Sequence, residues 1–157
     1  SVREEAEKNL AQLAPQEFIH DPYVLEFLNL KNYPALHETD IEKSLINNLQ
    51  SFLLELGKGF CFVARQKLMR YDNEDFYVDL VFYNRLLQCY VLIDLKTAKV
   101  SHQDLGQMQM YVNYFDRYVK QEFEKPTIGI LLCEEKNDAL VQLTLPENAN
   151  IYATEYC

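Results

Sequence analysis

Several patterns that identify common protein classes are missing from this sequence. Its four cysteines form no C-x-x-C pair, so a zinc site built from them is not expected. No apolar run approaches the roughly 18 residues that a membrane-spanning helix needs, and the first residues do not resemble a signal peptide. The sequence also contains no glycine-rich phosphate loop, no G-x-S-x-G and no internal repeat. We therefore expect a cytoplasmic protein without a membrane segment.

Basic residues are scarce as well. The net charge is −9, which argues against a protein that grips nucleic acid through its overall charge. The acids concentrate at the start of the chain, because residues 1–56 hold ten acids and four bases. The stretch from Gly57 to Tyr71 reverses this balance, with four bases and no acid. A basic strand is therefore available for a nucleic-acid contact even though the whole chain is acidic.

What is present fits a packed domain. A chain of 157 residues, 48% of them hydrophobic and 25% charged, is large enough and apolar enough for its own core. Cys61, Cys89 and Cys133 stand within apolar stretches, so we expect reduced thiols in that core. We expect residues 1–35 to form an N-terminal helical segment for packing or dimerisation, and residues 36–157 to form the main domain. Because the chain opens without Met, we expect a fragment of a longer protein, with the helical segment ending a preceding domain.

The remaining chain predicts alternating helices and strands. Thr39-Asp-Ile-Glu42 is a capping box that begins a helix, and Gly57 ends it. Ser101-His-Gln-Asp104 begins a second helix, in which Gly106 suggests a close approach to the sheet. The expected order is a helix at 39–56, strands at 60–70, 75–83 and 90–96, a helix at 101–119, a strand at 127–133, a short helix at 137–145 and a strand at 151–156. This order indicates an α+β fold, in which helices are layered on a mixed central sheet.

Two of these strands carry charged residues where buried strands should carry none. Alternate side chains of a strand share a face, so Asp94 and Lys96 lie on the same side. The short connection after Tyr83 predicts a hairpin. If Tyr83 pairs with Gln88, Asp79 lies diagonal to Asp94 on one face, roughly 7–8 Å away, and a shared cation can bridge that separation. A tighter hairpin would separate the two carboxylates by about 13 Å and break the site.

Two carboxylates and a lysine are the parts of a metal-dependent phosphodiesterase. Magnesium prefers oxygen ligands and is often held by only one or two carboxylates, with water and phosphate completing its shell. A lysine can orient or deprotonate the attacking water and offset the charge that develops on phosphorus. The alternative is structural: an edge hairpin with exposed charges, or an Asp–Lys ion pair. Val81 and Leu92 share the faces of the charged residues, which makes the structural alternative harder to accept.

The string DFYVDLVFYNRLLQCYVLIDLKTAK at 75–99 resembles the nuclease domain of the YhcG-type bacterial proteins, a branch of the PDDEXK superfamily. The resemblance extends from about Asp21 to the end of the chain and includes the phrase PTIGILLCEEKN at 126–137. It implies a restriction-endonuclease-like αβββαβ core in α/β/α layers, which agrees with the order of elements above. Two positions depart from the family: Asp94 stands where relatives more often have Glu, and Ala98 replaces a common glycine.

The resemblance also implies roles for individual residues. Asp79 and Asp94 would be metal ligands together with the Leu95 carbonyl. Lys96 would be the catalytic lysine, and Mg²⁺ or Mn²⁺ would be the cofactor. Magnesium needs oxygen donors of this kind, so the implied ligands and the implied metal are chemically consistent.

Three helical residues have two interpretations each. Gln107 and Tyr111 lie one turn apart, and their spacing is similar to a motif that borders the active site of RecB-like nucleases; without the resemblance they are boundary residues. Glu42 is fully explained as the last residue of a capping box. Its angular position on the helix, however, places it on the side of the apolar stripe. In the resembling superfamily an acid of this helix often reaches the metal.

A third set of residues concerns nucleic-acid contact. If Tyr71 pairs with Glu74, Gln66 falls opposite Asp79 and faces the site, where its amide could bind a phosphate oxygen; otherwise it is a surface glutamine. The residues that we expect to contact nucleic acid are Gln66, Lys67 and Lys99.

Together these features favour a Mg²⁺-dependent endonuclease that acts on DNA in bacterial restriction, repair or phage defence. The alternatives are a catalytically silent module of the same fold that binds nucleic acid or protein, and a purely structural domain of a larger complex. One such site cuts one strand, so a double-strand break needs two sites. We therefore expect a homodimer that pairs through the segment from Val2 to Asn29.

Overall fold

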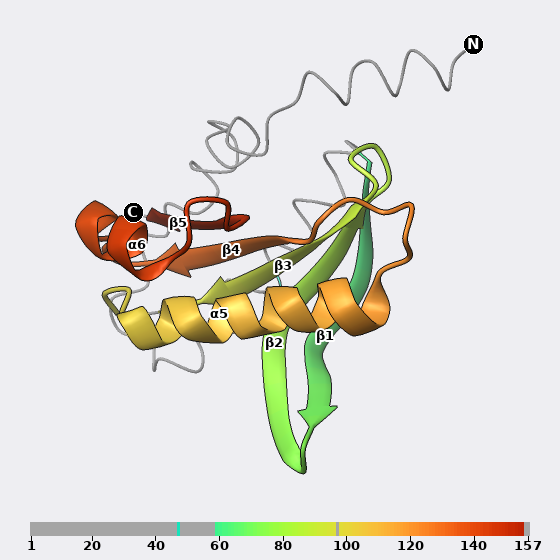
Figure 1. Cartoon of the computed structure of the whole chain (residues 1–157), viewed down its shortest axis with the longest axis horizontal. Coiled ribbons are helices and arrows are strands. Elements are labelled where there is room, and N and C mark those ends of the chain that lie inside the picture. Colours follow the sequence, from blue (N-terminus) through green and yellow to red (C-terminus); the bar gives the residue numbers. More distant parts are fainter. Residues whose placement is uncertain (1–46, 48–58, 97, 156–157) are drawn as a thin grey trace.

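The computed structural model describes residue 47 and residues 59–96 and 98–155 (Figure 1). The N-terminal segment at 1–35, the helix at 39–56 and Glu42 lie outside the described residues. The homodimer segment and Cys157 lie outside them too. None of the described helices is long and apolar enough to cross a membrane.

The described residues form one five-stranded mixed sheet with a long helix across one face (Figure 1). Neighbouring strands follow chain order; β1, β2 and β3 pair antiparallel, and β3, β4 and β5 pair parallel. The strands are β1 (Phe60–Tyr71), β2 (Glu74–Asn84), β3 (Cys89–Leu95), β4 (Ile128–Cys133) and β5 (Ile151–Glu155). The helices are α5 (His102–Tyr114), the π-helical turn η1 (Phe115–Val119) and α6 (Asp138–Thr144). The α+β class and the mixed sheet are confirmed.

Helix α5 packs on the sheet through one stripe of side chains. Leu105, Met108 and Val112 are buried on this stripe, and the Met108 and Val112 side chains lie against Gly129 of β4. A Cβ at Gly129 would lie 2.8 Å from the Met108 side chain, so the helix can approach only because a side chain is missing there. The predicted close approach at Gly106 is wrong, because that glycine is exposed and a Cβ would meet nothing within 4 Å.

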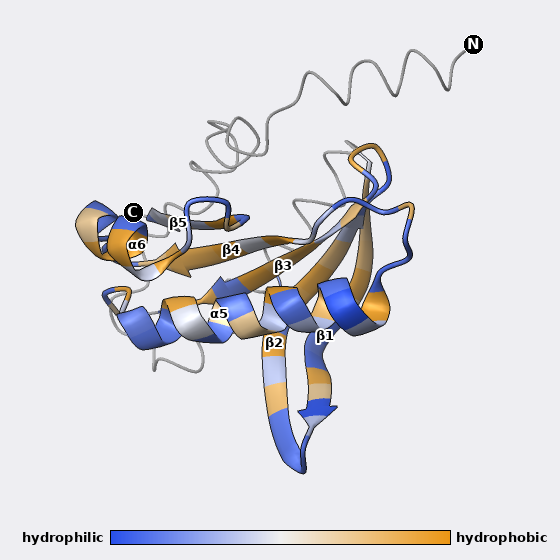
Figure 2. Ribbon diagram, viewed as in Figure 1, coloured by the Kyte–Doolittle hydropathy of each residue, from blue (hydrophilic) through white to orange (hydrophobic). Residues whose placement is uncertain are grey.

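Hydropathy changes along the sheet. β3 and β4 are hydrophobic along most of their length, whereas the far end of the β1–β2 hairpin is hydrophilic (Figure 2). Every residue of β4 is buried, as expected of an interior parallel strand. Cys89 and Cys133 are buried, and burial raises the pKa of each thiol to about 11. Cys61 is exposed, so its predicted burial is wrong. Its side chain lies on the exposed face of β1, a strand with one neighbour in the described sheet.

The register of the β2–β3 hairpin differs from the predicted one. Tyr83 pairs with Tyr90, two residues beyond the expected partner Gln88. The cause lies in the loop: the Asn84 side chain accepts hydrogen bonds from the Leu86 and Leu87 N–H groups at 3.0 and 2.9 Å. The connection is 85–88, between the paired Asn84 and Cys89, one residue further along than the connection 84–87 that the predicted pairing of Tyr83 with Gln88 required. Continued along the strands, the observed register places Asp79 directly opposite Asp94 instead of diagonal to it.

The β1–β2 hairpin has the predicted register at its turn. Tyr71 pairs with Glu74 across Asp72 and Asn73, which take the left-handed backbone conformation of a tight hairpin turn, with φ of 51° and 64°. The same register continues to the pair of Ala64 with Val81, and a bulge follows between Ala64 and Phe62. Within this run Gln66 has φ of 50° and forms no regular pair.

Candidate active site

The two aspartates lie where the regular pairing of β2 with β3 ends. The Asp79 N–H donates to Asp94 Oδ1 at 2.8 Å, and the Leu95 N–H donates to Asp79 Oδ2 at 2.8 Å. Each carboxylate is therefore held by the backbone of the strand opposite. The two side chains also hydrogen-bond to each other. The strands thus fix the carboxylates against one another, and neither needs a side chain from elsewhere to stay in place.

Burial disfavours the state in which both aspartates of this pair are ionised. Asp94 is only 5% exposed. Burial first, and then the charge of Asp79, raise the pKa of Asp94 to about 7. Burial also raises the pKa of Asp79, against the lowering by the Leu95 hydrogen bond and the Lys96 charge. Without a cation the pair holds a proton near neutral pH that an ordinary aspartate would have lost.

The donors of this pair fit a hard divalent cation. They are carboxylate oxygens, brought together in a buried position, and a cation there would replace the shared proton. Among residues 47, 59–96 and 98–155, no three His, Cys, Asp or Glu side chains are grouped closely enough to hold a metal by themselves. A site at Asp79 and Asp94 would therefore be completed by a backbone oxygen, water or phosphate, as magnesium commonly allows.

Lys96 extends from the end of β3 and is held from two sides. Its backbone N–H donates to the Leu132 carbonyl at 2.7 Å, which fixes the strand end against β4. Its Nζ lies 3.5 Å from Asp104 Oδ1, with both side chains largely shielded. The positive charge of Lys96 lowers the pKa of both site aspartates. The lysine is thus close enough to the carboxylate pair to act on the same substrate.

Asp104 is the residue of this arrangement that the sequence analysis did not identify. It was assigned only to the cap of α5, and that cap is present: the Ser101 N–H donates to Asp104 Oδ2 at 2.9 Å, and the Asp104 N–H donates to Ser101 Oγ at 3.2 Å. The cap occupies one carboxylate oxygen and leaves the other to Lys96. A capping box eight residues after a candidate lysine was the available signal, but the fold had to bring the two together.

Gln107 and Tyr111 border the pair from α5. Tyr111 is buried, and the first cause of its raised pKa is burial, followed by the negative charges of Asp94 and Asp79. The Gln107 side chain hydrogen-bonds to Tyr111. Tyr111 is therefore near the carboxylates and Gln107 is next to Tyr111, and the catalytic role of both stays a prediction.

The residues expected to contact nucleic acid lie on the surface. Gln66 is exposed, and it falls between the pairs of Arg65 with Leu80 and Lys67 with Val78. Lys67 is exposed too. Lys99 is exposed and forms an ion pair with Glu135, at 3.4 Å between Nζ and Oε2. Their roles stay predictions, and Glu42 lies outside the described residues.

The fold and the paired acids define the class of protein: a restriction-endonuclease-like domain. Two solved structures share the fold. A repair endonuclease from Pyrococcus abyssi superposes with a TM-score of 0.51 and 20% identity, over 78% of this chain and 49% of that chain. An EndoMS complex with double-stranded DNA superposes with a TM-score of 0.50 and 17% identity, over 81% and 49%.

The family follows from closer sequence similarity. Residues 16–157 match the family described as the YhcG PDDEXK nuclease domain, and this chain belongs to it. The Escherichia coli (strain K12) protein named "Putative nuclease YhcG" is 45% identical over 145 residues, which are 92% of this chain and 38% of that protein. The chain therefore spans well under half the length of that relative.

Proposed function

We propose that this chain is a divalent-metal-dependent endonuclease that hydrolyses DNA phosphodiester bonds, with Mg²⁺ or Mn²⁺ as the cofactor, in bacterial restriction, repair or phage defence. The observation that carries the proposal is the buried pair of Asp79 and Asp94 next to Lys96. A buried pair of acids costs stability unless it holds a proton or a cation, so its presence in a nuclease family favours a functional role. The relative solved with double-stranded DNA makes DNA the substrate to test first.

The cation would be held by Asp79, Asp94 and the Leu95 carbonyl. When bound, it supplies Lewis acidity toward the scissile phosphate and offsets charge in the transition state. The backbone hydrogen bonds to both carboxylates fix their orientation before any ligand arrives, which lowers the reorganisation that binding requires. Asp94 is buried and Asp79 is half-buried, which strengthens the electrostatic effect of the pair.

Lys96 would donate to the attacking water or to a phosphate oxygen. Its ammonium group is placed by the Asp104 carboxylate, which is itself fixed by the N-terminus of α5. Tyr111 and Gln107 would hold the wall of the site beside the pair through their mutual hydrogen bond. Each of these residues positions a group in advance, which is how an active site lowers the entropy cost of the reaction.

Nicking of supercoiled plasmid with Mg²⁺ or Mn²⁺ tests the function. The wild-type chain should nick, and Lys96→Ala should lower the rate roughly 100-fold or more. Lys125→Ala is the control, because Lys125 is an exposed lysine whose backbone N–H donates to the Gln88 carbonyl, at the opposite end of β3 from Lys96; it should nick at the wild-type rate. Binding of DNA without cleavage by any divalent metal would instead identify the catalytically silent module.

We also propose a homodimer, because one site of this type cuts one strand and a duplex break needs two. Light scattering on the full chain and on a chain without residues 1–29 tests this assignment. A monomer in both forms, well above micromolar concentration, would contradict it.

A further inference from the structure

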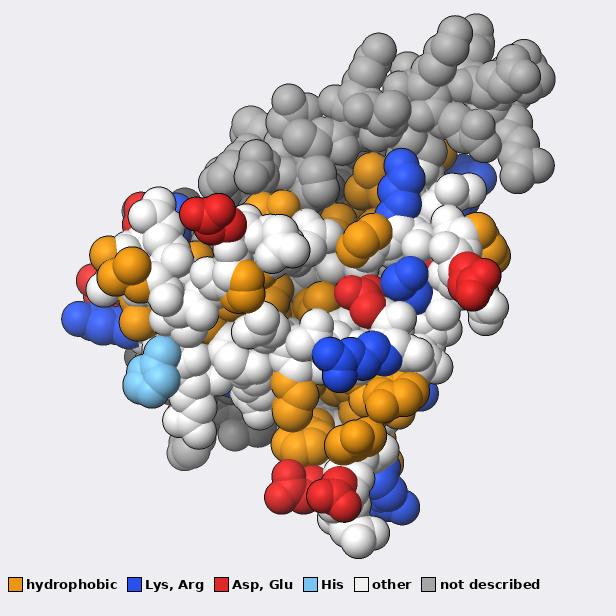
Figure 3. Space-filling view, in the orientation of Figure 1, with side chains coloured by type: hydrophobic (Ala, Val, Ile, Leu, Met, Phe, Trp, Pro, Cys, Tyr) orange, Lys and Arg blue, Asp and Glu red, His pale blue; other side chains and the backbone are white. Residues whose placement is uncertain are grey.

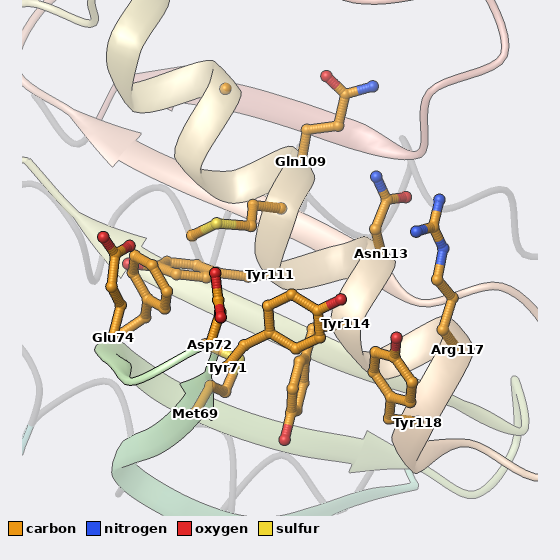
Figure 4. A pocket seen from close by; sticks show the side chains of 13 residues that line it. Met69, Tyr71, Asp72, Glu74, Gln109, Tyr111, Asn113, Tyr114, Arg117 and Tyr118 are labelled. Carbon is orange, nitrogen blue, oxygen red and sulfur yellow. The ribbon is translucent and has the colours of Figure 1, made fainter.

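A groove of about 490 Å³ runs between the outer part of the β1–β2 hairpin and the outer face of α5 and η1 (Figure 4). Its volume is within the range of small-ligand pockets. We call it the tyrosine groove, because tyrosines from both sides line it: Tyr71, Tyr111, Tyr114 and Tyr118. Hydrophobic side chains gather at this place on the surface, and acidic ones lie at the hairpin end (Figure 3).

Three of these tyrosines, Tyr71, Tyr118 and Tyr114, form a row of rings, and the rings of Tyr71 and Tyr118 are exposed to solvent, whereas Tyr111 is buried. The Tyr71 and Tyr118 centroids are 6.0 Å apart with their planes tilted by 30°, and Tyr114 lies 5.4 Å from Tyr118. Tyr71 is 58% exposed and Tyr118 is 60% exposed. The two also hydrogen-bond through their side chains. Ordered aromatic faces that remain exposed are suited to a flat ligand that stacks on them.

A polar rim follows the aromatic row. Gln109, Asn113 and Arg117 come from successive turns of α5 and η1 and project along one side of the groove (Figure 4). Asp72 and Glu74 line the hairpin side. The amides and carboxylates can pair with the donors and acceptors at the edge of a base, and Arg117 can contact an adjoining phosphate. The groove therefore offers stacking and edge recognition together.

The tyrosine groove and the candidate active site meet at helix α5. Tyr111 lines the groove and is buried, and its pKa is raised by burial and then by the charges of Asp94 and Asp79, so Tyr111 is a neighbour of both. Gly106 also lines the groove, and the space around its Cβ position is open. A strand whose phosphate reaches the carboxylates can thus place a neighbouring base in the groove.

We propose that the tyrosine groove binds an unpaired nucleobase of the strand that is cut. The inference rests on the proposed function and sharpens it: the substrate is DNA with unpaired nucleotides near the scissile bond, as in single strands, flaps or bulges. A base inside an intact duplex is stacked on both faces and cannot use the tyrosines, whereas an unpaired base can.

A fluorescence measurement tests the groove without requiring cleavage. The probe is a short single-stranded DNA that contains 2-aminopurine, mixed with the full chain in EDTA, and stacking on a tyrosine should quench it. Tyr118→Leu should weaken binding on the order of 10-fold and reduce the quenching, whereas Tyr118→Phe, which keeps the ring, should restore both. Tyr77→Leu is the matched control: Tyr77 is 55% exposed on the same hairpin and is not among the groove residues.

The outcomes separate the groove from the chemistry. Equal quenching by wild type, Tyr118→Leu and Tyr77→Leu overturns the inference even if plasmid is nicked. Absence of quenching by the wild-type chain also overturns it. Loss of quenching in Tyr118→Leu alone supports the groove even if no metal permits cleavage, in which case the proposed function fails by itself.

If the groove and the proposed function are both correct, cleavage should also favour DNA with unpaired nucleotides. With Mg²⁺, wild type should cut DNA with an unpaired stretch roughly 10-fold faster than a matched duplex, judged by kcat/KM. Replacing Tyr71 and Tyr118 by Leu should remove that preference and leave the duplex rate unchanged. A preference that survives the double substitution contradicts the proposal, provided that melting shows both proteins folded.

Discussion

Strand β2 carries two aspartates with opposite surroundings. Asp75, near the hairpin turn, is exposed and accepts two hydrogen bonds from Arg70, at 2.7 and 3.3 Å, and this side-chain pairing lowers its pKa. Asp79 lies four residues further on, and burial raises its pKa. One strand thus holds an exposed acid that is stabilised by an arginine and a half-buried acid that lies next to another acid.

The difference separates two kinds of charged pair. The Arg70–Asp75 pair is an ordinary surface ion pair, which contributes little to stability. The Asp79–Asp94 pair works against the folded state whenever both groups are ionised, because like charges share a buried space. Proteins keep such arrangements mainly where function requires them. Substitutions that change one of the two pairs at a time test this difference.

The largest effect is expected on cleavage. Asp94→Asn should lower the nicking rate roughly 100-fold or more, because one metal oxygen and its charge are lost while the shape is kept. Asp75→Asn changes an aspartate of the neighbouring strand in the same way and should nick at the wild-type rate. Equal losses in the two variants would show that the buried pair has no special role.

The next effect is a dependence of stability on pH. The pKa of Asp94 is raised to about 7 in the folded chain and returns to an ordinary value on unfolding, so its contribution is complete at low pH and is lost as pH rises through about 7. In EDTA the melting temperature should fall between about pH 4 and about pH 7 and level off above that. Asp94→Asn removes the ionisation and should flatten this fall. An unchanged slope in Asp94→Asn would assign the effect to other groups.

Added metal should reverse that loss. At about ten times its dissociation constant, Mg²⁺ should add about 1.4 kcal/mol, which raises the melting temperature by roughly 3–6 °C. Because the cation competes with the proton on the pair, the gain should grow as pH rises through about 7. Thermal unfolding with and without millimolar Mg²⁺, at about pH 6 and at about pH 8, measures this gain in melting temperature. Asp79→Asn should lose most of the gain.

A smaller effect is expected at Asp104. Asp104→Asn keeps a capping acceptor but removes the charge beside Lys96, and should lower kcat roughly 10-fold with KM nearly unchanged. Ser101→Ala removes only the cap and should cost about 1 kcal/mol of stability without the loss in kcat. Asp104→Glu should recover part of the rate. Equal kcat in Asp104→Asn and Ser101→Ala would show that Asp104 acts only as a helix cap.

The smallest effect is expected at the surface pair. Arg70→Gln removes the partner of Asp75, and both groups are open to water and salt. Its melting temperature and nicking rate should therefore match the wild type. A clear change in either would mean that the outer hairpin contributes more than its exposed ion pair suggests.

Much of the fold was predictable because local signals agreed. Alternation predicted the strands, the Ser101 capping box predicted the start of α5, and the Asp72-Asn73 turn set the register of β1 with β2. The β2–β3 register was not predictable from alternation, because the Asn84 side chain determines which residues form the loop. A shift of two residues keeps every side chain on its face, so the prediction placed the carboxylates on the correct face but at the wrong separation.

The site was predictable only in part. Asp79, Asp94 and Lys96 stood out as charges in apolar strands, and the structure brings them together. Asp104 could not be recognised, because its contact with Lys96 depends on how α5 returns across the sheet. The tyrosine groove was missed for the same reason: Tyr71 and Tyr118 are distant in the chain and meet only in three dimensions.

The central claim is that Asp79 and Asp94 hold the metal, and Mn²⁺ binding measured by electron paramagnetic resonance tests it most directly. The wild-type chain and Asp75→Asn should bind at least one Mn²⁺ per chain with the same affinity, while Asp79→Asn and Asp94→Asn should bind much more weakly. Equal Mn²⁺ binding by all four proteins would contradict the claim.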